Sequence, residues 1–188
     1  MRAIFLVFIA IVVVSALVVF RGRLFSQTKS RLANNDIYEG LRNQALHASR
    51  TEIGLTKPSD SKEPWGVLMD WPVAHGTATV VAFSDGNASI YLSSGGGYIG
   101  GSQSHPEIRD AAKQALHIAK GFMTEVHLAK NYPLPQSNEL TFWFMTDSGV
   151  YTTAASEEDL KTSRIPISKL ANAMQQIITQ YRLISNGK

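Results

Sequence analysis

The stretch GTATVVAFSDGNASIYLSS, from Gly76 to Ser94, decides the fold because it predicts a β-hairpin. Two runs rich in β-branched and apolar residues flank the pair Asp85-Gly86. That pair suits the left-handed backbone angles of a tight turn between antiparallel strands. A hairpin places its two strands side by side, so we expect an antiparallel sheet to form around it.

Further strands and helices are predicted on both sides of this hairpin. Short apolar runs bounded by turn residues indicate strands, and apolar residues recurring every three or four positions indicate helices. These patterns predict strands at WGVLMDW (65–71), ELTFWFMT (139–146) and VYTTAAS (150–156), and helices at 106–127 and 167–184. ELTFWFMT is apolar on both faces, which is typical of a buried central strand.

A first helix is predicted at DIYEGLRNQALHASR, residues 36–50, although Gly40 weakens the pattern. Helical spacing places four apolar residues on the face that we expect to be buried: Ile37, Leu41, Ala45 and Ala48.

The order helix, three strands, helix, two strands, helix predicts an α+β domain over residues 64–188. Its expected core is a five-stranded, mainly antiparallel sheet flanked by helices. This order resembles that of the roadblock, longin and profilin-like domains over residues 36–185. The resemblance implies a small sandwich that pairs with partners through a sheet edge or a helix.

A long apolar run stands ahead of this domain. Between Ala3 and Phe20 the single polar side chain is that of Ser15. Because roughly 20 helical residues cover the hydrocarbon core of a bilayer, we predict one transmembrane anchor at residues 1–25. The alternative is a signal peptide that is cleaved. Residues 26–63 are expected to form a basic tether, the first helix and a loop.

Basic residues beside the apolar run produce the net charge of +3, and the rest of the chain is slightly acidic. A nucleic-acid surface would need basic charge on the folded domain, so we exclude a nucleic-acid partner. Instead we expect contact with the anionic headgroups of a lipid bilayer through Arg21, Arg23, Lys29 and Arg31. The positive-inside rule then places the domain in the cytoplasm of a single-pass membrane protein. The alternatives are a location outside the cytoplasmic membrane and secretion after cleavage.

The glycine-rich loop YLSSGGGYIGGSQSHPE, residues 91–107, lies between a predicted strand and a predicted helix. Residues 95–100 formally match G-x-G-x-x-G, and Ser104 with Glu107 fits a capping box. Free backbone N–H groups at the start of a helix could hold an anion.

The surrounding sequence argues against a nucleotide motif in this loop. Its strand belongs to a hairpin, whereas the dinucleotide motif needs a parallel βαβ unit with an acidic residue ending the next strand. Ser102 follows Gly101 where a Walker motif would need lysine. We therefore interpret the loop as structural. The alternative is a small anion- or nucleotide-sensing site formed by Gly95, Gly96, Gly97, Gly100, Gly101, Ser104 and His105.

Catalytic and metal-binding patterns are weak. The chain has no cysteine, and its histidines do not form an i, i+4 pair or an H-E-x-x-H motif, so we predict no metal and no cofactor. His105 with Ser93 or Ser94 suggests a serine hydrolase, but no G-x-S-x-G elbow surrounds either serine. Asp70 could act as a base, although we expect it to be solvated. We predict no catalytic residue.

The leading hypothesis from the sequence is a noncatalytic, membrane-tethered protein-interaction or scaffold domain. Two arrangements are open: a homodimer, or a protein partner docked on the helix that carries Arg109 and Lys113. The anion-sensing loop is the second hypothesis, and the hydrolase is the third.

Overall fold

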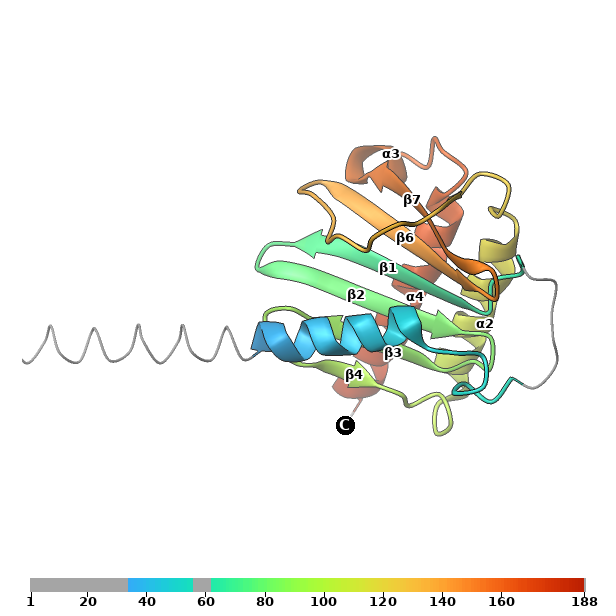
Figure 1. Ribbon diagram of the computed structural model, residues 1–188. Helices are drawn as coiled ribbons and strands as arrows, with labels where there is room; N and C mark the ends of the chain where they lie inside the picture. The colour runs from blue at the N-terminus through green and yellow to red at the C-terminus, as the bar shows by residue number, and fades with distance from the viewer. Residues whose placement is uncertain (1–33, 56–61, 188) are drawn as a thin grey trace, which may run out of the picture.

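A computed structural model describes residues 34–55 and 62–187, and in this part of the chain seven strands form one antiparallel sheet (Figure 1). The order across the sheet is β4-β3-β2-β1-β6-β7-β5. The bounds of the labelled elements are β1 Gly66–Val73, β2 Gly76–Phe83, β3 Ala88–Leu92, β4 Gly97–Ile99, α2 Pro106–Lys120, β5 His127–Leu128, β6 Glu139–Thr146, β7 Gly149–Ser156, α3 Glu157–Lys161 and α4 Ser168–Asn186. Residues 34–47 form a further helix, here called the amino-terminal helix.

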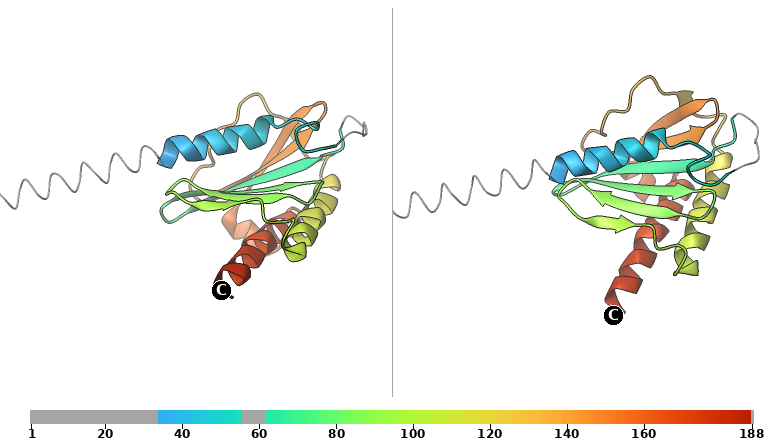
Figure 2. Two further views of the ribbon diagram at one scale, coloured as in Figure 1. Left: turned by 90° about the horizontal axis from the view of Figure 1, so that it is seen from below. Right: turned by 60° about the horizontal axis from the view of Figure 1, so that its bottom comes forward.

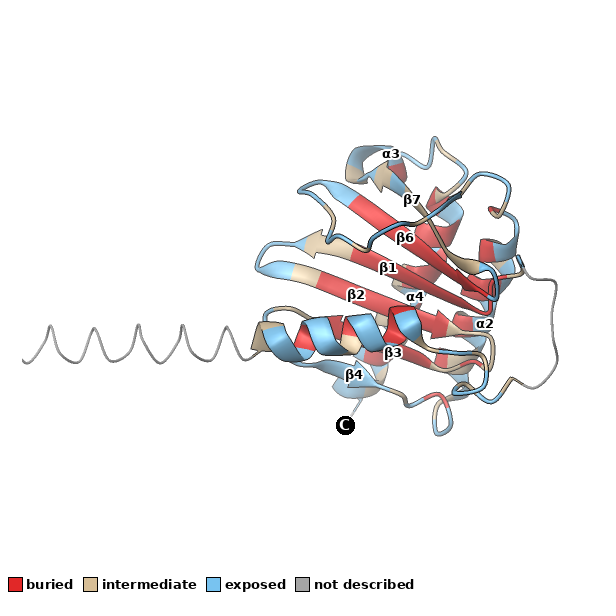
Figure 3. Ribbon diagram, viewed as in Figure 1, coloured by how far each residue is buried: buried red, intermediate tan, exposed pale blue. Residues whose placement is uncertain are grey.

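The sheet separates two hydrophobic cores. Helices α2 and α4 cover one face and the amino-terminal helix covers the other, so the domain has three layers (Figure 2). Because side chains alternate along a strand, one strand serves both cores. In β1, Val67 and Met69 face α2 and α4, whereas Leu68 faces the amino-terminal helix. Buried residues accordingly fill the middle of the central strands (Figure 3).

Strand β6 lies between β1 and β7 and contributes to both cores. Leu140, Phe142 and Phe144 pack toward α2 and α4, and Trp143 and Met145 pack toward the amino-terminal helix. A strand buried on both faces loses its polar alternation, which explains the continuous apolar run of its sequence.

Helices α2 and α4 pack against each other on their face of the sheet. The buried stripe of α2 contains the small residues Ala112, Ala115 and Ala119, which let α4 approach closely. Helix α4 contributes the larger side chains of Met174 and Ile177, both fully buried. The two stripes follow the helical periodicity of the sequence.

The prediction of a five-stranded sheet is wrong, because β4 and β5 extend the sheet at its two edges. Strand β4 has three residues and β5 has two, which is too short for an alternating pattern to be visible. The helix predicted at 106–127 is also shorter than expected, because α2 ends at Lys120 and His127 belongs to β5. The resemblance to roadblock, longin and profilin-like domains depended on the five-stranded order and is overturned with it.

The prediction of a single-pass membrane protein with a cytoplasmic domain is also corrected. Within residues 34–55 and 62–187, no helix combines the length and the apolar character needed to cross a membrane. The predicted anchor at residues 1–25 lies outside the described residues. So do Arg21, Arg23, Lys29 and Arg31, which were expected to contact lipid headgroups.

The buried face of the amino-terminal helix overlaps the predicted face only in part, because Leu41, Ala45 and Ala48 pack into the core but Ile37 does not. Ile37 is 63% exposed, whereas Tyr38, Arg42 and Leu46 are buried. The helix is therefore turned by about one residue relative to the predicted face. An arginine in the buried face is the reason, because its ionic partner lies in the sheet, as described below.

Replacing Gly40 with alanine should stabilise the protein. Gly40 lies inside the amino-terminal helix, its side is exposed, and no atom lies within 4 Å of an added Cβ. Alanine loses less backbone entropy in a helix, so urea denaturation should show a gain of about 0.5–1 kcal/mol. Gly97→Ala serves as the contrast, because its Cβ would collide with the carbonyl oxygen of Ile90 and should destabilise the fold. A loss of stability in Gly40→Ala would contradict the described helix.

Candidate functional site

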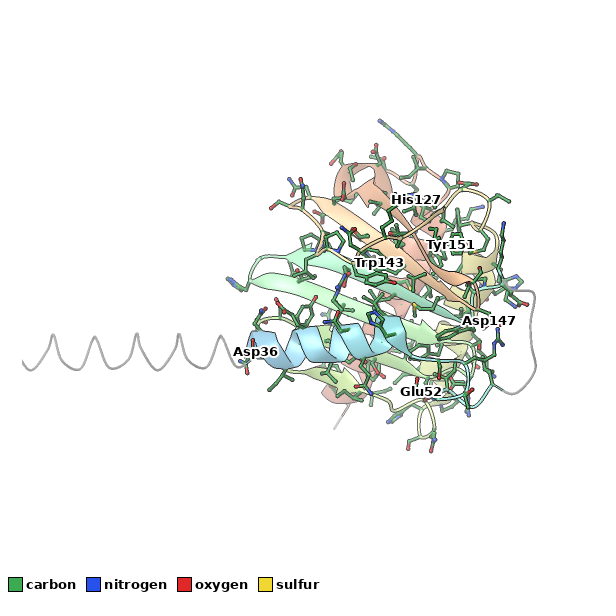
Figure 4. The ribbon with its side chains drawn as sticks, viewed as in Figure 1. Asp36, Glu52, His127, Trp143, Asp147 and Tyr151 are labelled. Atoms are coloured by element: carbon green, nitrogen blue, oxygen red, sulfur yellow. The ribbon has the colours of Figure 1, made fainter. Side chains whose placement is uncertain are left out.

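The most concentrated polar cluster of the described domain surrounds Asp70, which has no exposed surface. Three side chains donate hydrogen bonds to its carboxylate: Arg42 (Nη2 at 2.6 Å and Nε at 3.0 Å), Thr79 (Oγ1 at 2.5 Å) and Trp143 (Nε1 at 2.8 Å). Trp143 lies on the face of the sheet that carries the amino-terminal helix (Figure 4). The cluster therefore joins β1, β2 and β6 to that helix.

The guanidinium of Arg42 also binds the segment that connects β5 to β6. Its Nη1 donates to the carbonyl oxygen of Tyr132 at 3.0 Å, and its Nη2 donates to that of Pro133 at 3.2 Å. The same group stands 5.6 Å from the centre of the Trp143 ring, within the range of a cation–π contact. Arg42 thus holds together the helix, the sheet and a segment that crosses the sheet face.

Tyr38 completes the cluster through a hydrogen bond of 2.8 Å between its hydroxyl and Oγ1 of Thr79. Burial raises the pKa of Tyr38 to about 12, and the negative charge of Asp70 adds to the increase. Asp70 and Thr79 have no exposed surface, so no substrate can reach them in this arrangement. The cluster positions the helix, and it is unsuited to catalysis.

The sequence contained two signals for this cluster. Asp70 is a single carboxylate within an apolar strand, a place where a charge requires a partner. Arg42 follows Tyr38 by four residues and therefore lies on the same helix face. Neither signal identifies the pair, because the two residues belong to different elements. The expectation that Asp70 is solvated was wrong for this reason.

The first half of the glycine-rich loop is a hairpin turn between β3 and β4. The N–H of Gly95 donates to the carbonyl oxygen of Leu92 at 2.9 Å, and the N–H of Leu92 donates to that of Gly96 at 3.1 Å. Gly95 and Gly96 have φ angles of 106° and 82°, which favour glycine. The turn thus explains part of the glycine content without a ligand.

The second half of the loop leads into α2. The N-cap of this helix is His105, which makes no side-chain capping bond, so the predicted capping box of Ser104 and Glu107 is not formed. The N–H groups of Ser104 and His105 both donate to the carbonyl oxygen of Gly101, at 3.2 and 3.0 Å. The N–H of Gly100 donates to Oγ of Ser89 at 3.3 Å. These bonds leave fewer donors for an anion, and anion binding here stays a prediction.

A hollow of about 330 Å³ lies beside the loop, between β4 and the ends of α2 and α4. It brings together three of the predicted ligand-binding residues, Gly100, Gly101 and His105, but not the other four. The remaining lining residues are mostly apolar or aromatic: Tyr98, Ile99, Ile108, Tyr181, Ile184 and Ser185. This composition suits an apolar group better than a phosphate.

Two tyrosines form the wall of this hollow. The rings of Tyr98 and Tyr181 stack with their centres 4.9 Å apart, and Ser185 donates a hydrogen bond of 2.9 Å to the Tyr98 hydroxyl. The Tyr181 hydroxyl donates to the carbonyl oxygen of Ala88 at 2.7 Å and also contacts that of Gly100. Burial and the neighbouring Tyr91 raise the pKa of Tyr181 to about 12. Tyr181 therefore remains a donor that ties the loop to α4.

Within the described residues, no strand pairs with the outer side of β4, so this strand is an edge of the sheet. All three of its residues are exposed, including Tyr98 at 41% and Ile99 at 72%. The N–H of Leu92 binds the carbonyl oxygen of Gly96, so the polar groups of Gly96 point toward β3. Directions alternate along an antiparallel strand, so the N–H and C=O groups of Gly97 and Ile99 point away from the sheet.

The predicted interaction residues Arg109 and Lys113 lie over the turn between β2 and β3. A Cβ added to Gly86 would stand 2.5 Å from Cγ of Arg109 and 3.3 Å from Cε of Lys113. Arg109 is half-buried by this packing, and Lys113 remains exposed. The pair is therefore partly occupied within the domain, and a partner at this position stays a prediction.

A second, larger groove of about 470 Å³ lies between the β5–β6 connection and the sheet. Its floor comes from β6 and β7 and includes Thr141, Trp143 and Thr152, and its wall comes from residues 127–136. His127 marks one end of this region in Figure 4. The volume falls in the range of small-molecule sites, and no sequence pattern pointed to it.

The serine hydrolase and a metal site are the remaining chemical possibilities. Among the described residues, no hydrogen bond joins His105 to Ser93 or Ser94, and Oγ of Ser93 instead accepts the N–H of Thr77 at 2.8 Å. No group of three or more histidine or acidic side chains within residues 34–55 and 62–187 could hold a metal ion. The hydrolase hypothesis stays untested.

Comparisons of the chain with protein-family models, with curated protein sequences and with solved structures found no match.

Removing the carboxylate of Asp70 should destabilise the protein strongly. Asp70→Ala leaves the buried Arg42 charge without its partner, which typically costs about 3–5 kcal/mol. Urea denaturation of both proteins measures the difference. Lys161→Ala is the matched control, because it breaks the exposed Lys161–Glu157 pair and should change stability by less than about 1 kcal/mol. Equal effects of the two substitutions would contradict a structural role for the cluster.

The stability of the protein should fall as the pH rises from 10 to 12. Burial raises the pKa of Tyr38 from 10.0 to about 12, so in this window the folded chain keeps a proton that the unfolded chain has lost. A higher pH then favours unfolding. Denaturation at several pH values should show a shallower fall for Tyr38→Phe. An unchanged slope in that variant would show that Tyr38 ionises normally in the folded chain.

Proposed function

We propose that this protein is a noncatalytic protein-interaction domain that binds its partner through the open edge of the sheet at β4. The single observation that supports it is a strand edge beside which the described residues place no further strand, and whose side chains are exposed and uncharged. The unbonded N–H and C=O groups of Gly97 and Ile99 are a template for one more strand.

Apart from its short length of three residues, this edge lacks the charges and prolines that often prevent strand pairing. Natural edge strands are protected by lysines, prolines, inward-pointing charges or covering segments. From Gly95 to Ser104 the sequence contains no charged residue and no proline. At the opposite edge, β5 has two residues, and the chain between β5 and β6 then crosses the sheet face (Figure 1). This connection contains Pro133 and Pro135.

The distribution of reactive side chains favours binding over catalysis. The most concentrated polar cluster of the described domain, around Asp70, is buried. The hollow beside β4 has aromatic and aliphatic walls, with His105 as its one ionisable imidazole within the described lining. A site of this composition can hold an apolar side chain of a partner. It lacks the paired acid and base that hydrolysis requires.

A photoreactive amino acid at position 99 tests this proposal. The full chain carrying the group in place of Ile99 would be irradiated in the cells that produce it. We expect covalent adducts with protein, because a partner strand would lie beside this side chain. The adducts are detected as bands above 20.6 kDa on a denaturing gel.

The matched control places the same group at Leu128, an exposed apolar residue on the opposite edge strand. Adducts from position 99 should exceed those from position 128 severalfold. Equal yields from the two positions, or none from either, would rule out β4 as the binding edge.

A further inference from the structure

We infer that the partner at β4 is a second copy of this chain, joined by antiparallel pairing of the two β4 strands. This inference rests on the proposed function and identifies its partner. The pairing joins two seven-stranded sheets into one continuous sheet across a twofold axis. It uses one surface patch on both chains, as twofold dimers do.

The hydrogen-bonding pattern of β4 fits itself in antiparallel orientation. Gly97 and Ile99, whose polar groups point outward, lie at equal distances along the strand from Tyr98. Turning a second β4 about an axis through Tyr98 places Gly97 opposite Ile99 of the other chain, and Ile99 opposite Gly97. Each of these two pairs exchanges two main-chain hydrogen bonds, and the two Tyr98 residues face each other without one.

The side chains of this surface permit the same contact. A surface that meets its own copy must avoid like charges, and the segment from Gly95 to Ser104 has none. Gly97 has no side chain, so a second backbone can approach it closely. Tyr98 and the hollow behind it add apolar area on the face that carries α4. A strongly charged partner would find no complementary group here.

The size of the contact limits its strength. A strand of three residues with its flanking side chains falls at the small end of specific interfaces. We therefore expect a dissociation constant on the order of micromolar, and a dimer that separates on dilution. The fraction of dimer should thus depend on chain concentration.

Disulfide crosslinking of the full chain tests the inference, because the chain has no cysteine of its own. In the proposed register the facing Tyr98 residues have Cα atoms about 4.5 Å apart, which a disulfide can bridge. Mild oxidation of Tyr98→Cys should produce a reducible dimer of twice 20.6 kDa. Ile99→Cys should crosslink much less, because the two diagonal positions lie about 7–8 Å apart. Leu128→Cys, on the opposite edge, gives the background.

The substitution Tyr98→Cys removes the ring that stacks on Tyr181, so a second measurement keeps Tyr98 in place. Sedimentation of the unmodified chain and of Ile99→Asp should show a lower dimer fraction in the variant, because the new carboxylates repel each other across the axis. Ile99 is 72% exposed, so the substitution should leave the fold intact.

The outcomes separate the two proposals. Severalfold more dimer from Tyr98→Cys than from the other two cysteines, together with the effect of Ile99→Asp, supports the dimer and its register. Background crosslinking with no effect of Ile99→Asp overturns the dimer. If position 99 then still yields photoadducts with another protein, the edge binds a different partner. If it yields none, the proposed function fails as well.

Discussion

The buried carboxylate of Asp70 is the constraint on which the rest of the structure depends. A charge removed from water costs several kcal/mol unless it is paired and hydrogen-bonded. Arg42 supplies the opposite charge, and Thr79 and Trp143 supply further donors. Because Arg42 must face the sheet to pair with Asp70, the amino-terminal helix leaves Ile37 exposed. Two carbonyl oxygens of the β5–β6 connection, those of Tyr132 and Pro133, accept further hydrogen bonds from the guanidinium.

The Asp70 cluster and the β4 edge differ in their exposure to solvent. The ion pair under the amino-terminal helix is buried, although the groove of about 470 Å³ lies on the same face of the sheet. The edge at β4, by contrast, is exposed to solvent and carries no charged residue. Gly95 and Gly96 form the tight turn that leads into it. Substitutions at the β4 edge and in the Asp70 cluster can therefore be made independently.

Local patterns in the sequence accounted for the hairpin at 76–94, the run in β6 and the stripes of α2 and α4, because each is visible within a few turns or residues. Strands β4 and β5 could not be predicted, because they are too short to show a pattern. Their residues are strands only because they pair with β3 and β7. The ion pair between Arg42 and Asp70 could not be predicted from local sequence patterns either, because its two residues lie on different elements. Of the seven residues proposed as a ligand site, three line one hollow, and ligand binding there stays a prediction.

The pairing of β1 with β6 has a further consequence, for the order in which the protein can fold. The hairpins β1–β2–β3 and β6–β7 join neighbouring segments, whereas Asp70 pairs with Thr141 across a long loop that contains α2. Closing such a loop costs entropy before any contact offsets it, so this step is slow. Arg42 finds its full set of partners, including Tyr132, only after that closure. The complete contacts of the amino-terminal helix therefore depend on residues far along the chain, although this helix precedes every strand of the sheet.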